Sequence, residues 1–438
     1  MRAPAAAGER ASRVPHPTAF EKGAILLLVG FLLVFPKGGI KVAGVPLTWG
    51  YIALALVFLW FPLAILLGRS APVAKLRLLV PAMLLPFQAA VWMGLLANGI
   101  VDFGFAISLV VTFFFIPWMM VLILGIHLDR IDLRFLFGLI RVGVFAVSVY
   151  GIFLFFYRLK TGSFIEIPYL TVNAGDVGAL EDKFIDRGGV FKLISTYNNG
   201  NIYGVSILIL LPLYAWLERS PARQLVVKFA LLLTLSRTVW AGLILYEILQ
   251  RLYVRRISLR TVAVLAGSLA VVLGGLWYAL NLMGWDMAFL FDRRLGGRIG
   301  QLSALETATV LPGTPFEAIL EIVYLSVLHN FGIVGLAAFL VGMTAPVLLH
   351  LAGALPFSAT EYKRGLVTGL VVYLVVAMSD GALLFIPVMV FYWFVVSLLL
   401  SGNPSFLLYG ERESAAGASA AREARRTGGL PAPAGAGA

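Results

Sequence analysis

Ionisable side chains gather in one polar stretch of an otherwise apolar chain, at residues 285–336. Three arginines stand within six residues beside a glycine pair, in the sequence FDRRLGGRIGQ: Arg293, Arg294 and Arg298. Guanidinium groups and the backbone N–H groups that glycine leaves accessible both suit phosphate oxygens. The stretch predicts an anion-binding loop in which Arg298 makes the main ligand contact. Arg293 and Arg294 could equally pair with lipid headgroups, and a solvated loop without a ligand is the simpler alternative.

Two carboxylates follow in the same stretch, Glu317 and Glu321, four residues apart. That spacing predicts one face of a helix. Glu321 stands where the polar stretch passes into an apolar run, and a partly shielded carboxylate there could accept a proton as a general base. His329 lies two helical turns further along the predicted face, where a buried histidine bonded to a hydroxyl is the simpler interpretation. Glutamates on exposed loops most often have no chemical role.

A further arginine, Arg237, interrupts an apolar run in LLTLSRTVWAG and has no acidic neighbour in the sequence. An arginine at the end of a membrane span often extends towards the lipid headgroups. Arg237, however, would lie in a tight turn between two short spans, where little apolar surface would cover the stem of its side chain. Its planar fork of donors suits a phosphate, and we interpret it as a ligand for an anion.

An asparagine-rich segment, YNNGN at residues 197–201, precedes another apolar run. Asparagine and glycine there could simply begin a helix. Asn198 and Asn201 could also bind a sugar through their amides, with Tyr197 and Tyr203 as stacking surfaces. Further along the chain, Asp380 in MSDGALLF is interpreted as a turn residue.

Composition places the chain in a membrane. Hydrophobic residues make up 60% of 438 residues and charged residues 13%, and the mean hydropathy is +0.94. A soluble domain has about 25% charged residues. There is no cysteine, and the four histidines show no metal-ligand spacing, so we expect neither a metal nor a cofactor. Nothing in the pattern indicates nucleic-acid binding.

The sequence predicts an all-α polytopic membrane protein of about twelve transmembrane helices. The apolar runs are 23–35, 48–67, 78–96, 103–126, 136–157, 202–216, 225–235, 239–249, 261–282, 328–351, 366–378 and 386–400. Several are shorter than the roughly 20 residues that a span needs.

Charge decides whether runs 225–235 and 239–249 form one span or two. With two spans, the connections alternate between basic and non-basic, as cytoplasmic and outer connections do. One side then carries 23 Lys and Arg against 10 Asp and Glu, a net of +13, and the other 11 against 12, a net of −1, which together give the +12 of the chain. This favours two spans with both termini in the cytoplasm.

The alternation divides the chain into regions. Residues 1–22 form a cytoplasmic tail, residues 23–402 the membrane domain, and residues 403–438 a disordered cytoplasmic tail. Two large periplasmic loops are predicted, at 158–201 and 284–324. Loops on a rigid scaffold commonly carry function.

Three segments resemble the O-antigen ligase and polymerase superfamily, the WaaL- and Wzy-type proteins, and the resemblance covers roughly residues 20–402. They are YNNGNIYGVSILILLPL, LLLTLSRTVWAGLIL, and GGRIGQ followed after an interval by HNFGIVGLAAFL. The first departs from the family pattern because Asn199-Gly200-Asn201 replaces Asn-Pro-Asn. Family ligases carry a histidine eleven residues before the glycine at Gly332, and Glu321 stands at that place here. Tyr324 matches a family tyrosine.

The resemblance implies a metal-independent, inverting glycosyltransferase at the periplasmic face of the bacterial inner membrane that uses a lipid-diphosphate donor. Arg237 and Arg298 would hold the diphosphate of an undecaprenyl-diphosphate-linked glycan, and Glu321 would act as the base. Glutamate in place of the ligase histidine favours a polymerase that joins lipid-linked repeat units into O-antigen, capsule or exopolysaccharide.

Two alternatives remain open at this stage. One is a ligase that transfers glycan to lipid A-core, and the other is a flippase for the same lipid-linked sugar. A transporter places ionisable groups near the middle of the bilayer, whereas here they gather at one face, which favours an enzyme. Membrane lipids are expected partners, and the resemblance also admits a chain-length-regulating membrane protein.

Overall fold

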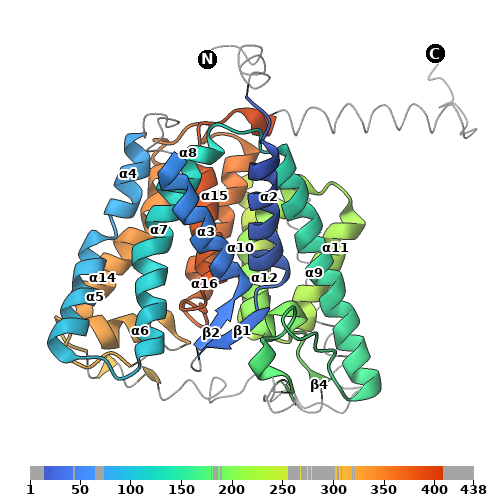
Figure 1. Ribbon diagram of the computed structural model, residues 1–438, viewed down its shortest axis with the longest axis horizontal. Helices are drawn as coiled ribbons and strands as arrows, with labels where there is room; N and C mark the ends of the chain where they lie inside the picture. Colours follow the sequence, from blue (N-terminus) through green and yellow to red (C-terminus); the bar gives the residue numbers. More distant parts are fainter. Residues whose placement is uncertain are drawn as a thin grey trace, which may run out of the picture.

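The computed structural model describes residues 14–42, 45–64, 74–178, 180, 186–187, 190–254, 267, 274, 278, 301–302, 305–306, 308–317, 319 and 321–407. Helices dominate this part of the chain and stand roughly side by side (Figure 1). The α-helices are α2 Ala19–Leu28, α3 Trp49–Ala64, α4 Lys75–Ala82, α5 Leu85–Asn98, α6 Phe103–Val110, α7 Ile116–Trp118, α8 Gly125–Leu128, α9 Arg134–Thr161, α10 Gly200–Leu217, α11 Pro221–Leu233, α12 Arg237–Leu249, α14 Val323–Leu351, α15 Glu361–Val376 and α16 Ile386–Leu400.

Shorter elements interrupt or extend these helices. Wider π-helical segments continue α2 and α12 and join α6, α7 and α8 into one rod: η1 Val29–Val34, η3 Val111–Phe115, η4 Met119–Leu124 and η7 Gln250–Val254. Two 3₁₀ turns are η5 Ala174–Asp176 and η6 Ser195–Tyr197. Two antiparallel pairs consist of β1 Gly39–Val42 with β2 Val45–Thr48, and β3 Asp186–Arg187 with β4 Val190–Phe191.

Helices occupy the predicted apolar runs, except that run 261–282 lies almost wholly outside the described residues. The runs 225–235 and 239–249 fold as two helices, α11 and α12, which turn back on each other. Lys228 Nζ of α11 lies 2.5 Å from Glu247 Oε1 of α12, which requires an antiparallel pair. The separation of these two runs is therefore confirmed at the level of helices.

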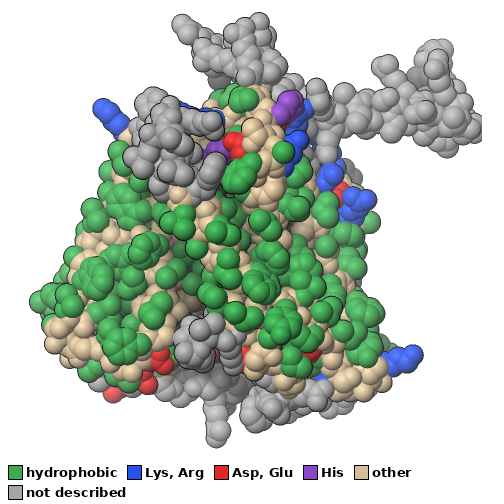
Figure 2. Space-filling view, viewed as in Figure 1, with side chains coloured by type: hydrophobic (Ala, Val, Ile, Leu, Met, Phe, Trp, Pro, Cys, Tyr) green, Lys and Arg blue, Asp and Glu red, His purple; other side chains and the backbone are tan. Residues whose placement is uncertain are grey.

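Five of the described helical stretches are long and apolar enough to cross a membrane: Lys75–Asn98, Phe103–Leu128, Arg134–Thr161, Gly200–Leu217 and Val323–Leu351. Figure 2 shows a broad band of hydrophobic side chains on the face in view, with most of the Lys and Arg side chains above it. Such a band is what a helix bundle needs in order to sit in lipid.

The interior is built on α10, α15 and α16. Glycine lets α15 approach α10 closely, because a Cβ atom at Gly369 would stand 2.3 Å from the Ile209 carbonyl oxygen. The Trp393 and Tyr203 side chains are fully buried between the helices. Small residues at helix contacts are the usual device for packing apolar helices in a membrane.

The connections collect at two ends of the bundle. At one end, Asp132 N donates to Pro15 O and Leu133 N donates to Ser405 Oγ, so the starts of α2 and α9 meet the end of α16 (Figure 1). We call this the basic end, because it carries Arg130, Arg134, Arg223, Lys363 and Arg364. At the other, the loop end, Val101 N donates to Phe316 O and Asn173 Nδ2 donates to Ile40 O.

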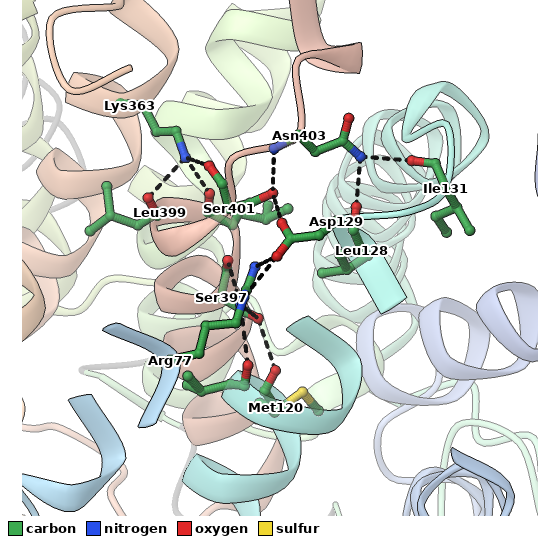
Figure 3. Close-up of polar contacts among 12 residues, drawn as sticks. Arg77, Met120, Leu128, Asp129, Ile131, Lys363, Ser397, Leu399, Ser401 and Asn403 are labelled. Atoms are coloured by element: carbon green, nitrogen blue, oxygen red, sulfur yellow. Dashed lines mark hydrogen bonds and ion pairs between the residues drawn. The ribbon is translucent and has the colours of Figure 1, made fainter. Parts of the chain in front are cut away.

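Buried cations hold the basic end together. Lys363 of α15 is fully buried, and its Nζ donates to the carbonyl oxygens of Leu398, Leu399 and Ser401 at 2.7–2.8 Å (Figure 3). These carbonyls belong to the last turn of α16, where a helix leaves its acceptors unsatisfied. The three donors of the ammonium group thus match three acceptors.

Arg77 of α4 is a second buried cation beside Lys363. Only 1% of the residue is exposed, and its Nε donates to Asp129 Oδ2 at 2.9 Å. The Ser401 hydroxyl donates to the other oxygen of the same carboxylate, which links α4, α8 and α16 (Figure 3).

The ordered bundle extends a few residues beyond the predicted membrane domain at both ends. Helix α2 begins at Ala19, capped by Thr18, rather than at residue 23. At the other terminus, Asn403 is buried and its Nδ2 donates to the carbonyls of Leu128 and Ile131. Residues 403–407 therefore pack into the bundle, because their side chains satisfy the end of α8, and the remainder of the predicted C-terminal tail lies outside the described residues.

Candidate functional site

The loop end brings together segments that lie far apart in the sequence. The first is the start of α10. Asn199 caps this helix, because its Oδ1 accepts from the backbone N–H groups of Asn201 at 2.8 Å and Ile202 at 3.2 Å. Asn198 has φ of 57°, and its Nδ2 donates to Thr171 O at 3.0 Å. A side chain at Gly200 would meet the Leu193 carbonyl at 2.6 Å, so glycine is needed there.

Asn201 joins the start of α10 to the turn between α15 and α16. Its Nδ2 donates to Asp380 Oδ2 at 2.5 Å, and Asp380 is only 5% exposed. The interpretation of Asp380 as a plain turn residue is therefore incomplete, since its carboxylate is an acceptor inside the site. Within the described residues, Asn201 Oδ1 is buried without a hydrogen-bond partner.

The turn between α11 and α12 reaches the same place. Leu235 has φ of 48°, and the Ser236 hydroxyl caps α12 by accepting from Val239 N at 3.4 Å. Thr238 Oγ1 lies 2.9 Å from Ser379 Oγ, next to Asp380. Arg237, between the cap and this contact, is half-buried.

Glu321 approaches from the large second loop. Its carbonyl oxygen accepts from Gly381 N at 3.4 Å, and Val323 N donates to Ala377 O at 3.3 Å. Gln301 Oε1 accepts from Ile322 N at 3.1 Å. The backbone around Glu321 is thus fixed on the α15–α16 turn, while its side chain is exposed.

The predicted helix through Glu317, Glu321 and His329 is wrong. Phe316 pairs with the α5–α6 connection by accepting from Val101 N and donating to Gly99 O, which holds the chain around Glu317 extended. Helix α14 begins only at Val323. Glu317 and Glu321 are therefore not neighbours on a helical face.

His329 differs from the prediction as well, because its side chain is exposed; its backbone carbonyl accepts from Thr314 Oγ1 at 3.3 Å. Helix α14 breaks just beyond it, at Gly332, where φ is 70°. The freed N–H groups of Ile333 and Val334 donate to the carbonyls of Thr309 and Val310. The loop thus satisfies the broken helix, as apolar surroundings demand.

The tyrosines of this region make hydrogen bonds that stabilise the fold. Tyr197 and Tyr203 are fully buried, and their hydroxyls bond Leu33 O at 2.9 Å and Ser148 Oγ at 2.8 Å. The hypothesis that they stack on a sugar is wrong, because both side chains are fully buried and support the start of α10. Tyr324 Oη donates to Leu374 O at 2.5 Å, which ties α14 to α15.

A cation that the sequence analysis did not single out lies at this end. Lys37 is half-buried, and its Nζ stands 4.4 Å from the centroid of the Phe385 ring at the start of α16. A lone lysine just after an apolar run is a weak signal, and only the tertiary contact with Phe385 distinguishes it.

The predicted anion-binding arginines Arg293, Arg294 and Arg298 lie outside the described residues. Of the residues predicted for the site, the structure ties Asn201 to the α15–α16 turn at residues 377–385 through its side chain and Glu321 through its backbone carbonyl. Arg237 precedes Thr238, whose hydroxyl contacts this turn, whereas Asn198 contacts Thr171 instead. Among the described residues, no cluster of three His, Asp or Glu side chains could hold a metal ion.

Comparison with known proteins places the chain in no family. No family model matches the sequence, and no curated protein matches it.

Proposed function

We propose that this protein is a membrane glycosyltransferase that joins lipid-diphosphate-linked oligosaccharide repeat units into a polymer. The observation that supports this most is the meeting of three distant segments at one turn. The α10 cap, the Ser236-Arg237 turn and Glu321 all contact residues 377–381. These are three of the places where the sequence resembles polysaccharide ligases and polymerases.

The proposed chemistry uses the side chains that these segments carry. The acceptor hydroxyl attacks the anomeric carbon of the donor sugar, the bond from that carbon to the phosphate oxygen breaks, and the lipid diphosphate leaves. Arg237 stabilises the charge that develops on the diphosphate, as preorganised donors do. Glu321 takes the proton from the acceptor hydroxyl. One displacement inverts the anomeric carbon.

Other groups would orient the substrates. Asn201 Oδ1, which has no hydrogen-bond partner among the described residues, would accept from a sugar hydroxyl while its Nδ2 donates to Asp380. Lys37 adds positive charge at the same end. Arg298 would be a second phosphate ligand by resemblance.

The glycan-length profile of a strain that lacks this gene tests the proposal. A missing polymerase leaves glycans of a single repeat. Full-length glycan that stays on its lipid carrier would instead identify a ligase, and lipid-linked repeats trapped in the cytoplasm would identify a flippase. Either result contradicts the polymerase.

Arg237→Lys keeps the positive charge but loses the planar pair of donors. We expect transfer activity to fall about 10²–10³-fold, the usual cost of losing one donor to developing charge. Membrane abundance should not change, because the Ser236 cap of α12 remains. The control is Arg223→Lys at the basic end, where the arginine pairs with Glu218 at 3.2 Å and activity should stay near that of the unmodified protein. Normal polymer length in Arg237→Lys contradicts the role.

Reporter fusions test the orientation that the charge distribution predicts. Fusions after residues 180 and 305 should report the periplasm, and fusions after residues 72, 255 and 410 the cytoplasm, because the basic end faces inwards. A cytoplasmic signal at residue 180 would refute the twelve-span arrangement and place the candidate site on the wrong side of the membrane for a periplasmic polymerase.

A further inference from the structure

A cavity of about 800 Å³ opens at the basic end, far from the candidate site. It lies between the start of α2, the middle of α3 and the region of α8. A volume of roughly 300–1,000 Å³ is typical of a pocket for one small ligand. A second, narrow cavity of about 70 Å³ adjoins it and shares the lining residues Ile25, Leu28, Leu124 and Leu128. The apolar space therefore continues into the bundle.

The lining changes from polar to apolar along both helical walls. On the α2 side, Thr18 and Glu21 come first and Leu28 lies further in; on the α8 side, Arg130 and His127 come first and Leu124 lies further in. The α2 wall from Glu21 to Leu28 covers about 10 Å at 1.5 Å per residue. The cavity thus has a polar mouth at the basic end and an apolar interior. This order of linings matches an amphiphilic ligand with a polar headgroup and an apolar tail.

Arg130 brings the positive charge that an anion would meet at the mouth. His16, which also lines the mouth, lies 3.1 Å from Asp132 Oδ2. His127 lies beside the one carboxylate among the lining residues, Glu21. That carboxylate accepts from Thr18 N at 2.6 Å and lies 3.4 Å from His127 Nε2. Basic pockets between helices at the cytoplasmic face are typical sites for anionic lipid headgroups.

One wall of the cavity is open towards the outside of the bundle. Leu27 of α2 and Leu56 of α3 line the cavity and are 47% and 60% exposed. Large apolar side chains at an opening are compatible with an acyl chain that enters from the side and incompatible with a polar solute.

We propose that this cavity holds one anionic phospholipid of the cytoplasmic leaflet, with its phosphate at Arg130 and an acyl chain along Leu28 and Leu124. The site rests on the membrane location of the protein and is independent of the proposed glycan transfer. A bound lipid would fill the space between α2, α3 and α8 and hold these helices at their present separation.

Gly23 offers a way to close the cavity without disturbing the fold. It lines the cavity, and a Cβ atom added there meets nothing within 4 Å, so Gly23→Leu extends into empty space and removes a helix-interior glycine. Gly138→Leu is the matched control, because a Cβ at Gly138 of α9 also meets nothing within 4 Å and this residue does not line the cavity.

The experiment incubates the full-length protein with vesicles of equal phosphatidylglycerol and phosphatidylcholine, extracts it in mild detergent, and counts retained lipids by native mass spectrometry. The unmodified protein and Gly138→Leu should each retain one phosphatidylglycerol, and Gly23→Leu at least tenfold less. Arg130→Gln, which leaves the apolar depth unchanged, should still retain a lipid but lose the preference for phosphatidylglycerol.

Equal retention by Gly23→Leu and Gly138→Leu overturns the proposal, as does a protein that retains no lipid. Retention without headgroup preference in the unmodified protein overturns the role of Arg130. None of these readouts requires a glycan donor, so they separate this proposal from the proposed transfer reaction.

Discussion

Glu321→Gln is expected to be a stable, well-expressed protein whose transfer rate is lower by about 10²–10⁴-fold, the usual loss when a general base is removed. This substitution should leave the local backbone contact unchanged. The contact that fixes the segment uses the Glu321 backbone carbonyl, which accepts from Gly381 N, so glutamine leaves it intact. The side chain itself is exposed at the loop end. The rate of transfer from a lipid-linked donor and the melting temperature should be measured together.

Glu317→Gln is the matched control for that variant. Both glutamates are exposed in the same loop, but Glu317 follows Phe316, which pairs with the α5–α6 connection and not with the α15–α16 turn. We expect the control to polymerise at close to the normal rate. Normal polymerisation by Glu321→Gln would remove Glu321 from the mechanism.

Lys363→Met is expected to have the largest effect on stability. The ammonium group donates to three carbonyl oxygens at the end of α16, and methionine would leave these buried acceptors without a partner. Each unsatisfied buried group costs about 1–3 kcal/mol. Removal of the buried charge offsets part of this cost, so we expect a net loss of about 3–5 kcal/mol. Monodisperse yield and melting temperature in detergent measure it.

Arg364→Met is the neighbouring control. Arg364 also lies in the first turn of α15, but it is half-buried, and its guanidinium stands 6.0 Å from the centroid of the Tyr253 ring. Its loss should cost about 1 kcal/mol or less, the value of a partly exposed cation–π contact. Equal melting temperatures for Lys363→Met and Arg364→Met would show that the lysine does not hold α16.

The sequence was sufficient to locate the helices. Apolar runs are long and are separated by polar or proline-containing segments, and a single segment satisfies its own backbone in lipid only as a helix. The division of residues 225–249 into α11 and α12 also followed from the sequence, because charge alternation and the Ser236-Arg237 pair both indicated a turn. The apolar runs are local signals, and the charge pattern depends only on the side of the membrane on which each connection lies.

The misassigned residues are those whose role depends on tertiary contacts. Nothing in the sequence distinguishes Lys363 and Arg77 from the other basic residues near the ends of apolar runs, yet both are buried, because the partners that bury them come from other helices. Asp380 looked like a turn residue for the same reason, since only the fold brings Asn201 to it.

The helix predicted through Glu317 and Glu321 had a different cause of error. A four-residue spacing is necessary for two side chains to share a helical face but does not show that a helix exists. Pairing of Phe316 with the α5–α6 connection determined the local backbone instead.

Transfer by the purified protein tests the central claim most directly. Full-length protein in detergent would be mixed with an undecaprenyl-diphosphate-linked repeat unit, without other proteins, and the products separated by length. Detergent removes the two compartments between which a flippase would act. The account predicts products of two and more repeats together with free lipid diphosphate, and far less of both with Glu321→Gln. A donor that stays unchanged with folded, unmodified protein would contradict it.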